Sequence, residues 1–383
     1  MVEESTGDAY NIDGRTNMET LFDFYSRNTE SYYGIEYSPK ELFSIEGNDT
    51  GACSSFICEH YAMGLKAGIV ETPEHWDRSN GDRSVHSTSL YLFGKSAMPL
   101  FSDFLSNRME ELGDNERDVY YVWYLTALYH DMATVIENTG FCTGKKQDDK
   151  TALRALKALD IKHSPYQAFP HQIREVPIRF TENTIKNYYR YRASANKYEH
   201  GIIAGYLFFD RFVKNFDMYT RGTNWSKEKV CFSKNPKGRV LSWRRENIMD
   251  AAYAADAIIC HNLWMAGKDK EAEYKRYHLS KLLYEEHPEN KLSISKFPLQ
   301  YMLCFIDTIE PTKRFESLTA YEVLTGISIE LEKEGLILYW QKNLEDRDKE
   351  FDGWLKNIRG MNTWMNITVE IEKNQRRVKF IFK

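Results

Sequence analysis

Four histidines and two aspartates stand within apolar, helix-compatible stretches, where a polar side chain is costly unless it is paired. They are His86, His130, Asp131, His200, His261 and Asp307. Any one of them alone is more often satisfied inside a core, but six in five separate stretches are difficult to explain as independent accidents. Imidazole with carboxylate is a ligand set of Mn, Fe, Co, Ni and Zn, whereas pure oxygen sites suit Mg. The sequence therefore predicts a site for one or two divalent metal ions, with Mg kept among the candidates.

Asp131 could join two ions, because a carboxylate has two oxygens. One arrangement places His86, His130, Asp131 and Asp307 on one ion and Asp131, His200 and His261 on the other. Two such ions activate water as a nucleophile and stabilise charge on a phosphoryl group. Asp131 is therefore the first predicted catalytic residue, as a ligand and as the group that orients the water. The alternative is a structural role, with one metal or none, in which the six residues are coincidental.

Cationic side chains near these ligands are candidates for binding phosphate. Arg83 precedes His86 by three residues and would lie on the same side of a helix. We predict that Arg83 and Arg314 grip phosphate, since a guanidinium forms two parallel hydrogen bonds to it, and that Arg83 also takes part in catalysis. Surface salt bridges are the alternative for both arginines.

The stretch YYRYRASANKYEH interleaves tyrosines with basic residues just before His200. We predict that Arg190, Tyr191 and Lys197 bind substrate, with a base stacked on the tyrosine and phosphates near the cations. A solvated helical face whose tyrosines cover the core is an equally weighted alternative.

The elements that must position these residues are predicted to be helices. Apolar residues recur at helical spacing in residues 84–105, 118–137, 184–212, 247–266 and 299–311. His86 shares one face of the first pattern with Leu90 and Phe93. His130 and Asp131 are adjacent and would lie about 100° apart around a helix. Both can reach one point only if that point lies at a seam between helices.

The predicted fold is mainly α, in three parts. Residues 1–80 form an N-terminal elaboration without a core of its own, and residues 81–316 form the helical domain, with insertions near 140–185 and 212–245. Residues 317–383 form a small α+β subdomain, since ISIELEKEGLILYW and MNITVEIEKNQRRVKFIF both indicate strand, turn and strand around a helical segment.

Composition narrows the class of protein. The 383 residues are 42% hydrophobic with a net charge of −5, which argues against an extended nucleic-acid platform. No run approaches the roughly 20 apolar residues of a membrane span, and the acidic N-terminus lacks a secretory pattern. Six cysteines without a CxxC pair favour reduced thiols. We expect a cytoplasmic protein that does not enter membranes, and a homo-oligomer is compatible with the sequence.

The ordered pattern H…HD…H…H…D over residues 83–316 resembles the signature of the HD superfamily of metal-dependent phosphohydrolases. The resemblance implies an HD-domain helical bundle that holds metals between helices and hydrolyses a phosphate ester or anhydride. RSVHSTSLYLFG, with Arg83 three residues before His86, is similar to the R-x-x-H-S stretch of the deoxynucleoside triphosphate triphosphohydrolases, where the arginine meets a substrate phosphate. DAIICH and FIDTIEPTKR resemble segments of the HD-type symmetrical dinucleoside tetraphosphate hydrolases.

The chain departs from both subfamilies. The triphosphohydrolases carry further histidines soon after the HD pair, whereas here none follows before His163. The tetraphosphate hydrolases are shorter and lack the insertions and the C-terminal appendage, and the GYP segment of the cyclic-di-nucleotide enzymes is absent. The favoured partner is a nucleotide substrate, either a dNTP or a dinucleoside polyphosphate. The alternatives are a cyclic nucleotide phosphodiesterase and a non-catalytic nucleotide-sensing HD module.

Overall fold

A computed structural model gives the fold. It describes residues 18–27, 36–44, 49–64, 81–111, 118–134, 159–168, 179–195, 197, 199–234 and 240–383. The described chain is mainly helical, with one small sheet near the C-terminus and a separate two-stranded hairpin. The prediction of a mainly α protein with a small C-terminal α+β unit is confirmed. Among the described residues, no helix has the length and apolar character needed to cross a membrane.

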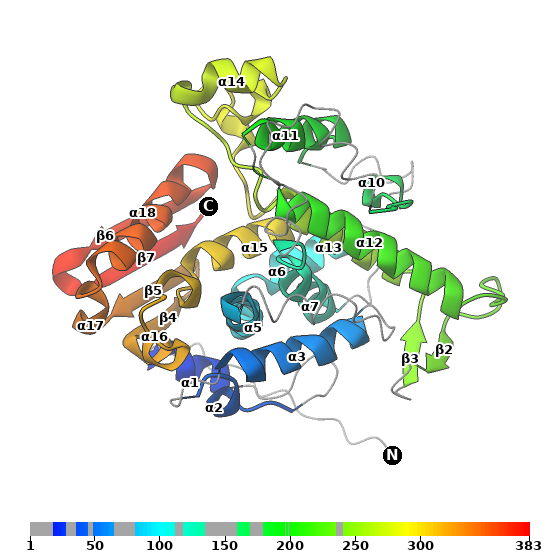
Figure 1. The fold of residues 1–383 in the computed structure, drawn as a ribbon, viewed down its shortest axis with the longest axis horizontal. Helices are drawn as coiled ribbons and strands as arrows, with labels where there is room; N and C mark the ends of the chain where they lie inside the picture. Colours follow the sequence, from blue (N-terminus) through cyan, green and yellow to red (C-terminus); the bar gives the residue numbers. More distant parts are fainter. Residues whose placement is uncertain are drawn as a thin grey trace.

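Six helices pack together, and one of them, α7, lies near the middle of the view in Figure 1. They are α3 (Asp49–Gly64), α5 (Gly81–Ser96), α7 (Val119–Tyr129), α12 (His200–Tyr219), α13 (Asn247–Cys260) and α15 (Pro298–Ile309). Helix α7 is buried on every side from Tyr121 to Tyr129, which explains why its sequence is apolar all round. It packs against α3, α5, α12, α13 and α15. The end of α7 therefore reaches the middle of the bundle.

Further helices of the described chain have between 4 and 13 residues. They are α1 (Leu21–Ser26), α2 (Pro39–Leu42), α6 (Ser102–Glu111), α10 (Pro165–Ala168), α11 (Glu182–Ser194), α14 (Glu271–Arg276), α16 (Ala320–Gly326) and α17 (Lys342–Glu345). Single 3-10 turns lie at η1 (Met98–Leu100), η3 (Lys268–Lys270), η4 (Ser280–Leu282), η5 (Pro288–Asn290), η6 (Thr312–Arg314) and η7 (Lys373–Gln375).

Helices α12 and α13 approach each other closely because glycines face the contact. A Cβ on Gly205 would lie 2.7 Å from the carbonyl oxygen of Ala255. A Cβ on Gly201 would lie 2.6 Å from Cε1 of His261 and 2.9 Å from the carbonyl oxygen of Ile258. Such distances are shorter than real Cβ contacts, so larger side chains would push the helices apart. The two glycines therefore fix the distance between the start of α12 and the end of α13.

The C-terminal unit is an antiparallel sheet covered by a long helix, α18 (Asp348–Trp364). Its strands are β4 (Ile327–Glu332), β5 (Gly335–Trp340), β6 (Ile367–Glu372) and β7 (Arg377–Phe382). The order is β1-β4-β5-β7-β6, so the edge strand β1 (Glu19–Thr20) comes from the other end of the chain. The predicted strand pairs form hairpins. The participation of β1 was not predicted, because two residues are too short to show alternation.

Several predicted boundaries differ from the observed ones. The pattern of 84–105 is interrupted by η1, where Pro99 stands, and continues as α6. Helix α12 continues to Tyr219 inside the predicted insertion 212–245, which then forms the hairpin of β2 (Cys231–Lys234) and β3 (Val240–Trp243). Of the predicted insertion 140–185, residues 140–158 and 169–178 lie outside the described residues. The described parts of 1–80 share the main core, since Leu21, Phe24 and Tyr25 are fully buried in it.

Asp256 on α13 gives a prediction about stability and pH. Its Oδ1 accepts a 2.9 Å hydrogen bond from the hydroxyl of Tyr166, and burial raises its pKa from 3.8 to about 6. The folded protein therefore keeps this proton at pH values where the unfolded chain has lost it. The stabilisation from this group is present below pH 3.8 and is lost as the pH rises through about 6.

We expect Asp256→Asn to be more stable than the wild type at pH 7, because an amide accepts the Tyr166 hydrogen bond without a buried charge. Urea unfolding of both proteins between pH 4.5 and 7 measures this difference. If Asp256→Asn is less stable than the wild type by the same amount at pH 4.5 and at pH 7, the raised pKa of Asp256 is contradicted.

Candidate metal centre

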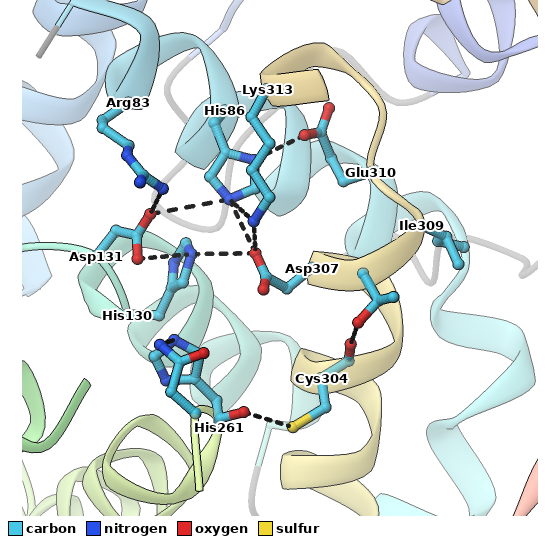
Figure 2. Close-up of polar contacts among 12 residues, drawn as sticks. Arg83, His86, His130, Asp131, His261, Cys304, Asp307, Ile309, Glu310 and Lys313 are labelled. Atoms are coloured by element: carbon cyan, nitrogen blue, oxygen red, sulfur yellow. Dashed lines mark hydrogen bonds and ion pairs between the residues drawn. The ribbon is translucent and has the colours of Figure 1, made fainter. Parts of the chain in front are cut away.

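The six predicted ligand residues meet at one place in the bundle (Figure 2, which labels all of them except His200). His86 lies in the first half of α5, and Asp307 lies in the last turn of α15. The others stand at helix ends. His130 caps the C-terminus of α7 and Asp131 follows it, His200 begins α12, and His261 caps the C-terminus of α13.

The ligand atoms form two neighbouring groups. His86, His130 and Asp307 form one, and Asp131, His200 and His261 form the other. Within each group the three donor atoms lie within 4.8 Å of one another, so each group could hold a metal ion. The imidazole rings follow one another through the site in the order His86, His130, His261 and His200, with centroids 5.4, 5.5 and 5.6 Å apart.

Asp131 lies between the two groups. Its Oδ1 is 3.1 Å from Nε2 of His200 and 3.5 Å from Nε2 of His130. Its Oδ2 is 2.9 Å from Nη1 of Arg83 and 3.9 Å from Nε2 of His86. One carboxylate therefore faces histidines of both groups, which is the geometry that a bridging ligand needs.

Three of the imidazoles are held by their Nδ1 atoms. Nδ1 of His130 lies 2.7 Å from the carbonyl oxygen of Ala127, and Nδ1 of His261 lies 2.6 Å from that of Ile258. Nδ1 of His86 lies 2.7 Å from Oε2 of Glu310. An Nδ1–H that donates to such an acceptor leaves Nε2 with a free lone pair, which is the tautomer of a metal ligand.

Nε2 of His130 tests whether the site suits a metal. This atom is fully buried and has no hydrogen-bond partner. It faces Asp131 and Asp307, whose nearest oxygens are 3.5 and 3.8 Å away. A buried acceptor without a donor is costly, and a cation at this position would satisfy it. The residues present therefore fit a divalent metal.

The protonation states also suit metal binding. Burial lowers the pKa of His130 to about 4 and that of His261 to about 3. Burial works against ionisation of Asp131 and Asp307, but their interactions with neighbouring side chains outweigh it and hold both pKa values well below the usual range. For Asp131 these neighbours include His130 and the guanidinium of Arg83, and for Asp307 they include the ammonium of Lys313 and a hydrogen bond with His86. Neutral imidazole and ionised carboxylate are the forms that bind metals.

Glu310 is a site residue that the sequence reasoning missed. Its carboxylate is fully buried, and its Oε1 accepts hydrogen bonds from Oγ of Ser89 at 2.6 Å and from the backbone N–H of Thr312 at 2.9 Å. Its other oxygen holds His86 (Figure 2). The signal in the sequence was an acidic residue three positions after Asp307, at helical spacing. Glu310 therefore orients a ligand rather than serving as one.

Asn262 and Lys313 were also missed. Nδ2 of Asn262 lies 2.8 Å from Nε2 of His200 and 2.9 Å from Nε2 of His261. Nζ of Lys313 lies 3.1 Å from Nε2 of His86 and forms an ion pair with Asp307. Hydrogen-bond donors of an amide and an ammonium group thus contact the nitrogen and oxygen atoms that could bind a metal in both groups. Their side chains are not in the usual ligand set, and only their nearness in sequence to His261 and Arg314 could have indicated them.

A cavity of about 1020 Å³ opens from the cluster. Its lining includes Asp131, His200, His261 and Asp307. Arg83 and Arg314, the two predicted phosphate contacts, also line it. Lys313, which contacts His86 and Asp307, lines it as well, so three cationic side chains share the cavity with the candidate ligands.

The other predicted substrate residues lie elsewhere. Arg190, Tyr191 and Lys197 are not among the described residues that line this cavity. The ring of Tyr191 packs against Tyr274 and Tyr277, with centroids 5.1 and 5.7 Å away. Nη1 of Arg190 lies 3.5 Å from the side-chain oxygen of Asn187, and Lys197 is exposed. This arrangement matches the alternative interpretation, in which the segment is a helical face whose tyrosines cover the core. The structure does not bring Arg190, Tyr191 and Lys197 to the site.

Comparisons of this chain with known proteins find no related protein. A scan against protein-family models finds no model that matches the chain, and searches of curated proteins and of solved structures find no match. Function has to be inferred from the site itself.

Proposed function

We propose that this chain is a metal-dependent phosphohydrolase of the HD type, which hydrolyses a phosphate ester or anhydride of a nucleotide. The observation that carries the proposal is the pair of ligand groups, with Asp131 facing both, in a cavity whose lining also includes Arg83, Lys313, Arg314 and Lys356. Four histidines and two aspartates suit first-row divalent metals, although Mg is kept among the candidates. Nε2 of His130, a buried nitrogen without a hydrogen-bond partner, supports a bound ion at this position.

The residues of the site have distinct roles in this proposal. One ion would be held by His86, His130 and Asp307, and the other ion would be held by His200 and His261. Asp131 would contribute to holding both ions. Ions held there would activate water for attack and stabilise negative charge on the phosphoryl oxygens. Arg83, 37% exposed and hydrogen-bonded to Asp131, is placed to bind a phosphate oxygen and to keep Asp131 oriented. Arg314 has a buried Nε without a hydrogen-bond partner, so it can bind phosphate without first losing another bond there.

The size of the cavity supports a nucleotide rather than a small phosphate. Its volume of about 1020 Å³ is at the upper end of the roughly 300–1,000 Å³ of ligand pockets. A dNTP or a dinucleoside polyphosphate is the favoured substrate, and a cyclic nucleotide or a non-catalytic sensing role are the alternatives. The cytoplasmic location and a homo-oligomeric state stay predictions.

Metal binding is the first test. We expect purified protein to bind one to two equivalents of transition metal, measured by elemental analysis. At a metal concentration 100 times the dissociation constant, the free energy of unfolding should rise by about 2.7 kcal/mol, seen as a higher Tm. His130→Ala should remove most of this rise, whereas His287→Ala, a histidine paired with Glu289 outside the cluster, should keep it. Protein without metal, and with no rise in Tm on adding Mn, Fe, Co, Ni or Zn, would contradict the proposal.

Hydrolysis of a nucleotide is the second part of the same test. The metal-loaded protein is incubated with dNTPs, dinucleoside polyphosphates, cyclic nucleotides and nucleoside monophosphates, with each metal in turn, and the products are separated by anion-exchange chromatography. Cleavage of a dNTP or a dinucleoside polyphosphate is the expected result. Conversion of cyclic nucleotides alone, to nucleoside monophosphates, would favour the phosphodiesterase. Metal and nucleotide binding without cleavage would favour the sensor.

A further inference from the structure

The cavity extends beyond the metal ligands to the C-terminal unit. Residues of α18 form part of its wall: Lys356, Asn357, Gly360, Thr363 and Trp364. Positions separated by three, four and seven residues share one face of a helix, so a single face of α18 lines the cavity. The C-terminal unit is therefore a part of the site and not only an appendage.

Both α18 and η6 contribute residues to the lining of the cavity, and the two elements are in contact. Lys313 and Arg314 line it from η6 and Lys356 from α18. Lys313 is bound to Asp307 and His86, whereas Lys356 is exposed. Cations on both walls suit a chain of phosphates leading away from the metal ligands.

An aromatic pair, Trp264 and Trp364, also lines the cavity. The indoles of Trp264 and Trp364 meet edge to face, with centroids 4.9 Å apart and planes at 81°. Trp264 is 36% exposed, which is unusual for so large an apolar side chain. Two hydrogen bonds fix its backbone. The N–H of Trp264 donates to the hydroxyl of Tyr188 at 3.3 Å, and its carbonyl oxygen accepts from the hydroxyl of Tyr274 at 3.0 Å. The exposed indole is thus held in place at the cavity.

We infer that α18 and Trp264 form the binding surface for a nucleobase, with the base against the Trp264–Trp364 pair and the phosphates between η6 and Lys356. This inference rests on the proposed function and names the part of the site that selects the substrate. A planar ring with polar edges suits the surface, since indole offers an apolar face and the side chains of Asn357 and Thr363 offer hydrogen-bond donors and acceptors nearby.

Gly360 makes the inference testable. A Cβ at Gly360 would meet no atom within 4 Å, so a larger side chain there extends into the open space that the residue lines. Gly353 stands two turns earlier on the same helix, is equally unobstructed and does not line the cavity. Leucine is a better helix former than glycine, so neither substitution should unfold α18. Gly360→Leu and Gly353→Leu are therefore a matched pair.

The experiment compares binding of dATP and of inorganic tripolyphosphate to the Mn-loaded protein. Binding is read from tryptophan fluorescence in the first milliseconds after mixing, before turnover. The quantity compared is the ratio of the affinity for dATP to the affinity for tripolyphosphate. We expect Gly360→Leu to lower this ratio by about ten-fold or more, and Gly353→Leu to keep the wild-type ratio. Trp264→Ala should lower the ratio similarly, with Trp364 still reporting, and Trp264→Phe should restore most of it.

The possible outcomes separate this inference from the proposed function. An unchanged ratio in Gly360→Leu and Trp264→Ala overturns the inference, and so does a wild-type protein that binds no dATP. If dATP is hydrolysed while the ratio is unchanged, hydrolysis stands and the base-binding surface does not. If the ratio falls as expected but no nucleotide is hydrolysed, the surface stands and the proposed hydrolysis fails.

Discussion

Asp131→Asn is expected to abolish hydrolysis and to lower metal affinity by more than about 100-fold, since even a partner of a ligand accounts for about 10- to 100-fold. The substitution keeps the size of the side chain but removes its charge. Both carboxylate oxygens of Asp131 face histidines, at 3.1 Å from His200 and 3.9 Å from His86, so the loss should affect both groups of ligands. Metal content by elemental analysis and the rate of hydrolysis of the best substrate measure the two effects.

Asp256→Asn is the control for this experiment. It also removes a carboxylate that burial affects, but it lies outside both groups of ligand residues and does not line the cavity. It should keep the metal content and the activity of the wild type. Loss of one equivalent of metal in Asp131→Asn, with the other bound as in the wild type, would assign Asp131 to a single ion and remove the bridging role. Wild-type activity in Asp131→Asn would remove the two-metal proposal.

The ligand residues could be found from the sequence because their surroundings are local. A histidine or an aspartate inside an apolar helical pattern is visible without any knowledge of the fold, and the six lie in five such patterns. The helical class and the C-terminal hairpins were equally local, since periods of 3.6 and 2 residues are properties of short segments. The structure adds that the six side chains meet, which no pattern along one segment can establish.

The positions of the ligands at helix ends could not be predicted. The apolar pattern of 118–137 continues past His130, yet α7 ends at Tyr129 and Nδ1 of His130 lies 2.7 Å from the carbonyl oxygen of Ala127 in its last turn. Periodicity does not show whether a side chain takes that place. The same arrangement recurs at His261, whose Nδ1 lies 2.6 Å from the carbonyl oxygen of Ile258.

The residues that line the cavity could not be predicted from the sequence for a different reason. Trp264 and Trp364 are 100 positions apart and lie 4.9 Å apart only because the C-terminal unit packs beside the end of α13. The tyrosine and arginine cluster of 188–192 had the more obvious composition, but Tyr188 and Tyr189 are buried in the core. Composition indicates what a side chain can bind, and the packing of the helices decides whether it reaches the site.

Glu310→Ala is expected to lower metal affinity by about 10- to 100-fold while leaving all six ligand residues in place. The fully buried carboxylate of Glu310 accepts from His86 at 2.7 Å, and it is ionised because its hydrogen bonds with His86 and Ser89 lower its pKa although burial opposes this. Without it, the ring of His86 can rotate, and Nδ1 of His86 loses its partner. The ion held by His86, His130 and Asp307 should be affected more than the other. Competition with a chelator of known affinity measures the two sites separately.

Two further variants separate orientation from charge. Glu310→Gln keeps an oxygen that can accept from Nδ1 of His86, so it should lose less affinity than Glu310→Ala if orientation is the main contribution. Ser89→Ala removes the 2.6 Å donor to Glu310 but leaves the contact with His86, and it should have the smallest effect of the three. Wild-type metal affinity in Glu310→Ala would show that packing alone orients His86. Equal losses in Glu310→Gln and Glu310→Ala would instead assign the effect to the negative charge, which makes the imidazole a stronger ligand through its Nδ1–H.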